Sequence, residues 1–412
     1  MRNHKLIWCS LLALAGCSSV SDPKGPPAPV SELPRALTAS EQLVSQAGNQ
    51  FTLALFRKLN EAQPNANVFV SPLSVSVSLG MTMNGAAGAT LADMRSALGF
   101  GAAQLSDINE GYRGLMGLES GLDPTTTFQI ANSVWHRQDL PVKQSFVDEV
   151  KQTFDAEVRA SPFDASTLTQ VNGWVNEKTN GKIPTILDEI KPENVMFLIN
   201  AIYFKGSWRE QFDPAQTLDG PFAAVGGGGT QTVKLMHRNA EGKTLRFSST
   251  GTLTMGELVY GNTAFVMTIL MPTSGTDVNG LAATLDTAAW RAALGSLRDA
   301  KVDVSLPKLK LEYERELKDD LEALGMLTPF LPDVADFTGM SPLGKQMYIS
   351  FVKHKTFVDI NEEGTEAAAV TNTGMFFTSA PPCLCVQRPF IFAIRERFSG
   401  TILFIGKIVR IP

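Results

Sequence analysis

Apolar and polar residues follow two different periods along this chain, one typical of helices and one typical of strands. Between Leu43 and Leu59 apolar residues recur at helical spacing, which predicts an amphipathic helix after a possible cap at Ser40. The segments 195–204 and 265–271 are almost wholly apolar, as expected of strands that are covered on both faces. The two periods together predict helices packed against large sheets.

The last part of the chain predicts a β hairpin. The apolar runs 389–394 and 402–409 are joined through residues 398–400, which include a glycine. Earlier helices followed by long strands, without a regular βαβ alternation, favour an α+β domain. The glycines at 226–229 predict a short tip between strands, and no later segment resembles a linker between domains.

The N-terminus has the pattern of a targeting segment. Residues 1–5 are basic and 6–16 are apolar, a run too short to span a bilayer, which needs about 20 residues. The sequence LAGC at 14–17 resembles the lipobox of bacterial lipoproteins, which implies that Cys17 is acylated and becomes the mature N-terminus. The alternative is an ordinary signal peptide in which Cys17 occurs by chance. Because Ser18 is not the aspartate that retains such proteins in the inner membrane, an outer-membrane lipoprotein, facing the periplasm or the surface, is expected.

Residues 21–34 contain five prolines, which exclude a helix or a central strand and predict a stiff spacer between the lipid and the folded part. The predicted organisation is a lipoprotein signal peptide at 1–16, a lipidated cysteine with a Pro-rich tether at 17–36, and one folded domain at 37–412.

Composition and motifs argue against several functions. The chain has 412 residues and a net charge of −5, without the basic footprint of a nucleic-acid partner. After the signal segment only His136, His237 and His354 remain, and none lies in a metal-binding or catalytic motif. We therefore predict no catalytic residue, no metal and no cofactor. A lipid-anchored hydrolase stays a distant alternative, because a catalytic triad is a spatial arrangement.

Cys383 and Cys385 are the cysteines that remain after Cys9 and Cys17. Two residues apart in an extended segment, their side chains point the same way at a span poorly suited to a disulfide. We expect two small, semi-buried thiols.

The segment after residue 357 combines a strand pattern with unusually small residues. An apolar strand leads into Gly364. Of the residues at every second position from Thr365, which share one face, none is charged, large or proline. The members of this face are Thr365, Ala367, Ala369, Thr371, Thr373 and Met375. Such a segment can be an exposed loop and can also enter a sheet as a half-buried strand. A small-residue loop that never inserts is the alternative.

The same segment resembles the hinge of the reactive-centre loop in inhibitory serpins. Five blocks occur in the order of that family across residues 40–412: 67–74 (NVFVSPLS), 175–183 (VNEKTNGKI), 200–208 (NAIYFKGSW), 361–369 (NEEGTEAAA) and 388–392 (RPFIF). The resemblance implies the serpin fold, with three β-sheets, eight to nine helices and an exposed reactive-centre loop at about 363–382. The hinge that it implies consists of Glu363, Gly364, Thr365, Glu366, Ala367, Ala368 and Ala369.

In that family a serine-type protease cleaves the loop and is trapped as an acyl-enzyme when the loop inserts into the large sheet. Family spacing, counted from the hinge and from Pro389, places the reactive bond at Thr378–Ser379. No Lys or Arg occurs from 356 to 387, so elastase- or subtilisin-like targets are expected. Phe376 and Phe377 offer alternative bonds to chymotrypsin-like enzymes, unless these rings only pack on the surface.

Further residues match the family's supports for the moving sheet. Ser71, Ser74, Asn200 and His354 resemble the shutter, a polar cluster beneath the sheet where its strands part. His354 also lies on an apolar strand face, which predicts burial and hydrogen-bond partners whether or not it has that role. Trp208 resembles the family residue that lies below the point where the loop enters the sheet, a region called the breach. Core packing alone would explain a tryptophan at this position equally well.

The expected function is thus suicide inhibition of serine-type endopeptidases by a monomer, in covalent complex with the target and joined to a membrane through its lipid. A non-inhibitory serpin that acts as a binding or chaperone module is the main alternative. No glycan cofactor is expected, because Arg113 is the one Lys or Arg residue in the segment 101–136.

Overall fold

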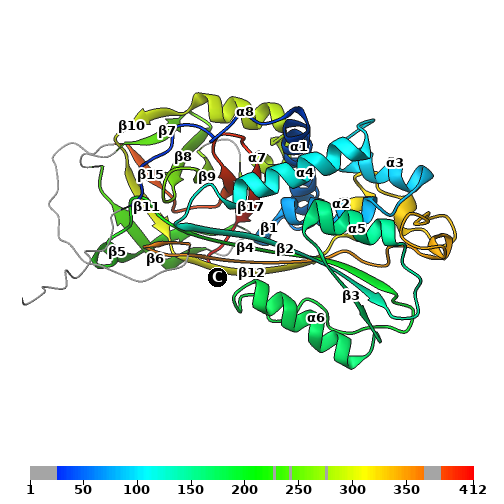
Figure 1. The fold of residues 1–412 in the computed structure, drawn as a ribbon. Helices are drawn as coiled ribbons and strands as arrows, with labels where there is room; N and C mark the ends of the chain where they lie inside the picture. Colours follow the sequence, from blue (N-terminus) through cyan, green and yellow to red (C-terminus); the bar gives the residue numbers. More distant parts are fainter. Residues whose placement is uncertain (1–25, 226–228, 241–243, 274–276, 366–381) are drawn as a thin grey trace, which may run out of the picture.

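The computed structural model describes residues 26–225, 229–240, 244–273, 277–365 and 382–412 (Figure 1). In this part of the chain nine α-helices and three β-sheets form an α+β fold, which confirms the predicted class. The helices are α1 (Ala39–Ala62), α2 (Pro72–Met83), α3 (Gly88–Ala97), α4 (Leu105–Ser120), α5 (Gln144–Phe154), α6 (Ala165–Lys178), α7 (Val278–Thr284), α8 (Thr287–Ser296) and α9 (Lys318–Glu322). None of the helices described is long and apolar enough to cross a membrane.

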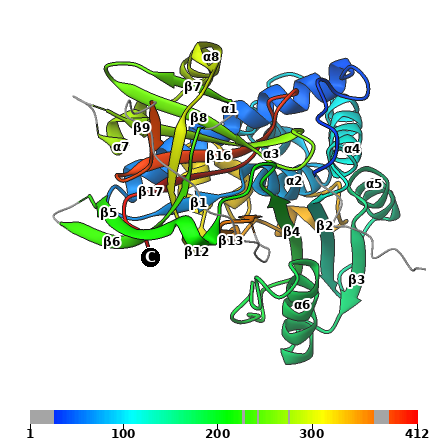
Figure 2. The ribbon, with the colours of Figure 1, turned by 90° about the vertical axis from the view of Figure 1, so that its left-hand side faces the viewer.

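The six-stranded sheet has the order β12-β13-β14-β4-β2-β3. Its strands are β12 (Leu309–Glu316), β13 (Lys353–Ile360), β14 (Gly364–Thr365), β4 (Met196–Ser207), β2 (Thr126–Arg137) and β3 (Glu157–Ser161). Figures 1 and 2 both show α6 on one face of this sheet and α2, α4 and α5 on the other. The sheet is therefore the middle layer of this half of the molecule.

The other two sheets lie toward the end of the molecule away from β3 (Figure 2). The seven-stranded sheet, in order, is β1 (Val68–Val70), β17 (Ile402–Ile408), β16 (Phe390–Glu396), β9 (Phe265–Pro272), β8 (Leu253–Val259), β7 (Leu245–Ser249) and β10 (Arg298–Ala300). The four-stranded sheet, in order, is β15 (Cys383–Cys385), β11 (Asp303–Pro307), β6 (Thr230–Arg238) and β5 (Thr217–Ala223).

Alternation along β4 divides the hydrophobic residues into two cores. Phe197, Ile199 and Ala201 pack with the buried face of α6, whereas Ile202 and Phe204 belong to the main core on the other side. Successive side chains of a strand point to opposite faces, so one strand can serve both cores.

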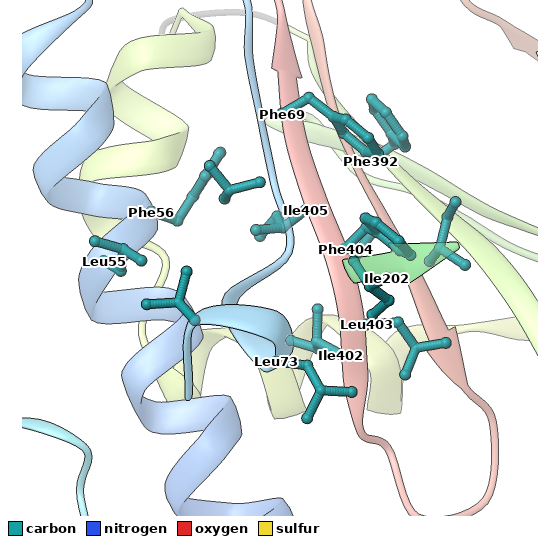
Figure 3. Close-up of a cluster of buried hydrophobic side chains, with 14 of the residues drawn as sticks. Leu55, Phe56, Phe69, Leu73, Ile202, Phe392, Ile402, Leu403, Phe404 and Ile405 are labelled. Atoms are coloured by element: carbon teal, nitrogen blue, oxygen red, sulfur yellow. The ribbon is translucent and has the colours of Figure 1, made fainter. Parts of the chain in front are cut away.

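Part of the main core lies between α1, α2 and the strands β1, β16 and β17 (Figure 3). Phe69 stacks between Phe392 and Phe404 with ring centroids 5.5 and 5.4 Å apart. Each such buried side chain contributes about 1.5–3 kcal/mol relative to an exposed one. The packing fixes β1 and the start of α2 rigidly behind the six-stranded sheet.

The strand patterns in the sequence are confirmed in detail. All residues of β9 are buried, β16 and β17 pair as the predicted antiparallel hairpin, and in β13 every second residue, including His354, is buried. The first helix begins earlier than predicted. Its cap is Thr38 rather than Ser40, because Thr38 forms a reciprocal capping box with Glu41.

The prediction of two free thiols was wrong. Cys383 and Cys385 form a disulfide, with their Cα atoms 5.2 Å apart. Two steps of a fully extended strand span about 6.6 Å, so the backbone here is contracted. The contraction brings the Cα distance well inside the range that disulfides adopt, about 4.4–6.8 Å.

Part of the segment predicted as a tether contacts the folded body. The Val30 amide donates to the carbonyl oxygen of Asn262 at 2.8 Å, and Thr263 Oγ1 donates to the Val30 oxygen at 2.9 Å. Arg209 Nη1 donates to the Pro27 oxygen at 2.7 Å. The boundary between tether and domain stays a prediction, but residues 27–30 are held against the turn after β8.

Candidate functional site

The chain turns back into the six-stranded sheet directly after β13. In β14, Gly364 pairs with Ser207 and Thr365 with Gly206 of β4, and Thr365 also pairs with Ile360 of β13. β14 has only two residues, while the strands on both sides of it continue. The first residues of the predicted hinge thus already form the start of a strand between β13 and β4.

Glycine is required at 364 because the backbones of β14 and β4 come close together there. A Cβ atom added there would lie 2.1 Å from the carbonyl oxygen of Gly206 and 2.6 Å from the Cα of Ser207. These are backbone atoms, so any side chain at this position would push the hinge away from β4.

Thr365 points into the molecule, as the small-residue face requires. Its side chain is buried, and its Oγ1 lies 3.1 Å from the Tyr260 hydroxyl. Tyr260 follows β8 and is fully enclosed. The first position of the predicted inward face is therefore already in the place that an inserted strand would give it.

Glu363 is buried next to this pairing, where the charge of Lys205 only partly offsets the effect of burial. Both of its carboxylate oxygens lack a hydrogen-bond partner among the described residues. Burial raises the pKa of Glu363, and the neighbouring charge of Glu362 raises it further. Because a buried, unpaired carboxylate is costly, the hinge carries a local source of instability.

Trp208 lies at the end of β4 and supports the hinge from below. Its indole Nε1 donates to the carbonyl oxygen of Asn361 at 2.9 Å, and its amide donates to that of Glu363 at 2.6 Å. The ring stacks on Tyr260 with centroids 4.5 Å apart. Trp208 thus binds the backbone on both sides of the turn that leads into β14, a contact that exceeds ordinary core packing.

A chain of hydrogen bonds connects the four predicted shutter residues in the middle of the sheet. His354 Nε2 accepts from the Ser71 amide at 3.0 Å, and the Ser71 hydroxyl accepts from the Ser74 amide at 3.3 Å. Ser74 Oγ donates to Asn200 Oδ1, and Asn200 Nδ2 donates to Asn132 Oδ1 at 2.7 Å. The chain links β13, α2, β4 and β2.

Burial fixes the charge state of this chain. His354 is 4% exposed, and burial lowers its pKa to about 4. A neutral ring can accept the Ser71 proton at Nε2, which a charged ring cannot do. The cluster is therefore uncharged at neutral pH.

A cavity of about 300 Å³ opens next to this chain, between β4 and the segment that leads into β13. Residues on its two sides include Leu198 and Asn200 on β4 and His354 and Lys355 on β13, with Ser74 below. In the described part of the chain no strand fills the sheet between these two edges beyond β14. The arrangement leaves room for a strand that continues from Thr365.

The family model described as "Serpin (serine protease inhibitor)" matches residues 46–411. The chain belongs to the serpin family. It is 35% identical over 371 residues to Serpin B8 of Homo sapiens, covering 88% of this chain and 98% of the relative. It is also 35% identical to the leukocyte elastase inhibitor of Sus scrofa, covering 89% of this chain and 99% of the relative. The native state of the thermophilic serpin Tengpin superposes with a TM-score of 0.81 at 32% identity, covering 93% of this chain and 97% of that one.

Serpins are a family of protease inhibitors and not of enzymes, so the chain is assigned to a family of inhibitors. The three sheets and nine helices of the described residues form the serpin fold. Within those residues no group of acidic, His or Cys side chains is arranged to hold a metal ion.

Several predicted site residues lie outside the described residues of this serpin. They are Cys17, the distal hinge residues Glu366, Ala367, Ala368 and Ala369, and the candidate bonds at Phe376, Phe377, Thr378 and Ser379. Their roles stay predictions.

Sequence reasoning missed three contributors to the site. Asn132 extends the shutter chain into β2, Tyr260 lies between Trp208 and Thr365, and Lys308 holds the Glu362 carboxylate at 2.8 Å. None of them lies in a quoted motif, and each is far from its partner in the sequence. A polar residue between the apolar Ile130 and Val134 on one face of β2 was the one local signal, and it pointed to Asn132.

Proposed function

We propose that this serpin is a suicide inhibitor of serine-type endopeptidases, which it traps by inserting its cleaved reactive-centre loop into the six-stranded sheet. The observation that carries the proposal is the position of Gly364 and Thr365, already paired between β4 and β13. The buried Thr365 side chain and the cavity farther down the same gap support it.

The loop is long enough to carry a protease far from its starting position. From Gly364 to the proposed bond after Thr378 the strand would extend over about 46 Å, at roughly 3.3 Å per residue. The neighbouring strand β4 has 12 residues, about 36 Å at the same rise, so the attached enzyme would be moved along the whole sheet. Distortion of its active site there would stop deacylation.

Side-chain burial decides whether insertion is favourable. New backbone hydrogen bonds contribute about 0.5–1.5 kcal/mol each, whereas ordering costs about 1–2 kcal/mol per residue. These contributions nearly cancel, so the inward face has to bury side chains without a penalty. An unpaired charge on that face would prevent insertion.

The expected targets are elastase- or subtilisin-like, with chymotrypsin-like enzymes at the alternative bonds. Thr378 suits a small specificity pocket, and no Lys or Arg occurs near it to anchor a trypsin-like enzyme. The 35% identity to an inhibitor of leukocyte elastase agrees with this class of target.

The test is to mix the protein with elastase, subtilisin and chymotrypsin and to run a denaturing gel. We expect an SDS-stable complex with at least one enzyme, and none when the enzyme's serine is blocked. Thr365→Arg should convert the inhibitor into a substrate that is cleaved without a complex. Thr365→Val, which loses only the contact with the Tyr260 hydroxyl, is the matched control and should still form it. An undiminished complex with Thr365→Arg, or simple cleavage of the wild type by all three enzymes, would refute the proposal.

The proposal includes a lipid on Cys17, which would place the inhibitor at the cell envelope. A diacylglycerol and an N-linked acyl chain together give stable anchoring, at about 0.8 kcal/mol per buried CH₂. We expect Cys17→Ser to move the protein from the membrane fraction to the soluble fraction. Unchanged partitioning of Cys17→Ser would exclude the anchor.

A further inference from the structure

The disulfide between Cys383 and Cys385 lies in a strand at the edge of a sheet. β15 pairs in parallel with β11 through Asp303 with Cys383, Val304 with Leu384 and Ser305 with Cys385. It is one of the two edge strands of the four-stranded sheet in the described residues, and β5 is the other. Beyond the three pairs, the Asp303 amide donates to the Pro382 oxygen at 3.0 Å and the Val386 amide to the Ser305 oxygen at 2.7 Å.

Alternation leaves the sulfur atoms on the accessible side of this strand. Leu384 is fully buried and lies so close to β8 that a Cβ atom added at Gly256 would be 2.6 Å from its Cδ2. Cys383 and Cys385, on the opposite face, are half-buried. A disulfide with this exposure can be attacked without unfolding of the core.

We propose that Cys383–Cys385 is a thiol-exchange site that a dithiol reduces in the native protein, and that reduction weakens the attachment of β15 to β11. One thiolate of the dithiol attacks a sulfur of the pair, which forms a mixed disulfide and releases the other cysteine as a thiolate that takes up a proton. The second thiol of the reagent then attacks the mixed disulfide. The reagent is oxidised to its disulfide, and two electrons and two protons pass to the cysteines.

The bridge stabilises β15 by limiting the conformations of the detached strand. It fixes Leu384 in a contracted backbone with the Cα atoms of its neighbours 5.2 Å apart. A cross-link that closes so short a loop removes little chain entropy, and the expected change in the equilibrium for detachment is roughly tenfold. Reduction returns this freedom to the strand while Leu384 keeps its apolar contact.

The consequence for inhibition rests on the proposed function. β14 lies in the six-stranded sheet and β15 in the four-stranded sheet, and the predicted reactive loop connects them. An uncut chain cannot extend far into the first sheet unless Pro382–Cys385 leaves the second, because the connection has a fixed length. Weaker pairing of β15 would therefore shorten the lifetime of the intact inhibitor.

The first experiment measures the site without reference to inhibition. The full-length protein is treated with dithiothreitol under native conditions and quenched with iodoacetamide, and peptides with Cys383 and Cys385 are weighed. We expect both cysteines to be alkylated, and we expect exchange of the Asp303 and Val386 amides to rise about tenfold on reduction. A Cys383→Ser, Cys385→Ser double variant should show the fast exchange with or without dithiothreitol. Alkylation only after denaturation, or unchanged exchange on reduction, would overturn the proposal.

The second experiment measures the lifetime of the intact inhibitor. Oxidised, reduced and double-variant proteins are incubated near 37 °C, and the fraction that still forms the SDS-stable complex is followed. The reduced protein and the double variant should lose this ability several-fold faster than the oxidised protein. Equal lifetimes would overturn the coupling to inhibition. If no protein forms a complex even at the start, while exchange responds to reduction, the thiol-exchange site stands and the inhibitory function falls.

Discussion

His354 lies on the core-facing side of β13, where its neutral ring accepts a hydrogen bond from the backbone of Ser71. The same position in a solvent-exposed strand would titrate near pH 6.5. Burial lowers the pKa of the ring to about 4, so protonation and the hydrogen bond exclude each other. A single side chain thereby makes the connection between β13 and α2 dependent on pH.

The stabilising effect of this histidine should disappear in acid. The pKa of His354 in the folded protein lies below its unfolded value. Between pH 6.5 and pH 4 the imidazole is therefore protonated to a greater extent in the unfolded chain than in the folded protein. The stability is complete above pH 6.5 and falls toward pH 4, by up to about 3 kcal/mol. We expect His354→Gln, which keeps an acceptor but does not titrate, to lose less stability than the wild type between pH 7 and pH 5 in urea titrations.

The wild type has to be compared with His354→Gln, because another buried group changes the stability with pH in the opposite direction. Burial raises the pKa of Glu119 to about 8, with a further contribution from the charge of Glu396. The contribution of Glu119 to stability is therefore present below its unfolded pKa and is lost as pH rises toward 8. This effect is common to wild type and variant and cancels in the difference. Parallel pH profiles for the two proteins would contradict the role assigned to His354.

At the scale of elements, three short segments depend for their position on contacts with longer elements. β14 has two residues, β15 has three, and residues 27–30 form no element, yet each contacts a sheet or the turn next to it. The last of these lies close to the hinge. Arg209, next to Trp208, donates from one nitrogen to Pro27 at 2.7 Å and to Gly261 at 2.8 Å.

Removal of this link should loosen the N-terminal segment. Hydrogen bonds from a charged donor contribute about 1.5–3 kcal/mol, so we expect Arg209→Met to raise hydrogen exchange of the Val30 amide by tenfold or more. Arg137→Met is the matched control, because Arg137 contacts Asp139 and Pro192 instead and should leave Val30 protected. Val30 protection that persists in Arg209→Met would show that the hydrogen bonds of Val30 with Asn262 and Thr263 hold the segment without Arg209.

The whole molecule combines a filled core with an incompletely filled sheet. The apolar residues behind β1 and β17 are closely packed, as Figure 3 shows. The six-stranded sheet in contrast has a cavity between β4 and the approach to β13, and an unpaired buried carboxylate at Glu363. If the proposed function is right, a fold with this distribution should gain stability when a further strand enters the sheet.

We therefore expect cleavage between Phe376 and Ser379 to raise the thermal unfolding temperature, because the free end can then add backbone pairs and bury the residues that follow Thr365 on the same face. The measurement is calorimetry of the intact and the cleaved protein. Cleaved Thr365→Arg is the control and should show a smaller rise. An unfolding temperature that does not increase after cleavage of the wild type would mean that the sheet stores no usable instability.

The sequence by itself determined the features that depend on neighbouring residues. Period-two burial along β13, the apolar β9, the hairpin of β16 and β17, and the small residues from Thr365 onward are local patterns, and the described ones are confirmed. The resemblance in five blocks also predicted the sheets and the helices, and it singled out four residues that hydrogen bonds connect in the structure, although their role as a shutter stays a prediction. It could do so because a family pattern records contacts that local periodicity does not.

Tertiary structure alone decided the contacts between distant segments and the exact path of the backbone. Tyr260 reaches Thr365 across 105 positions of sequence, and Asn132 reaches Asn200 across 68, so no window of sequence contains either pair. The contraction that joins Cys383 to Cys385 arises in a strand that was assumed to be extended. Hydrogen bonds and disulfides require atoms to lie within a few tenths of an ångström of a set geometry, and only the assembled fold fixes positions to that tolerance.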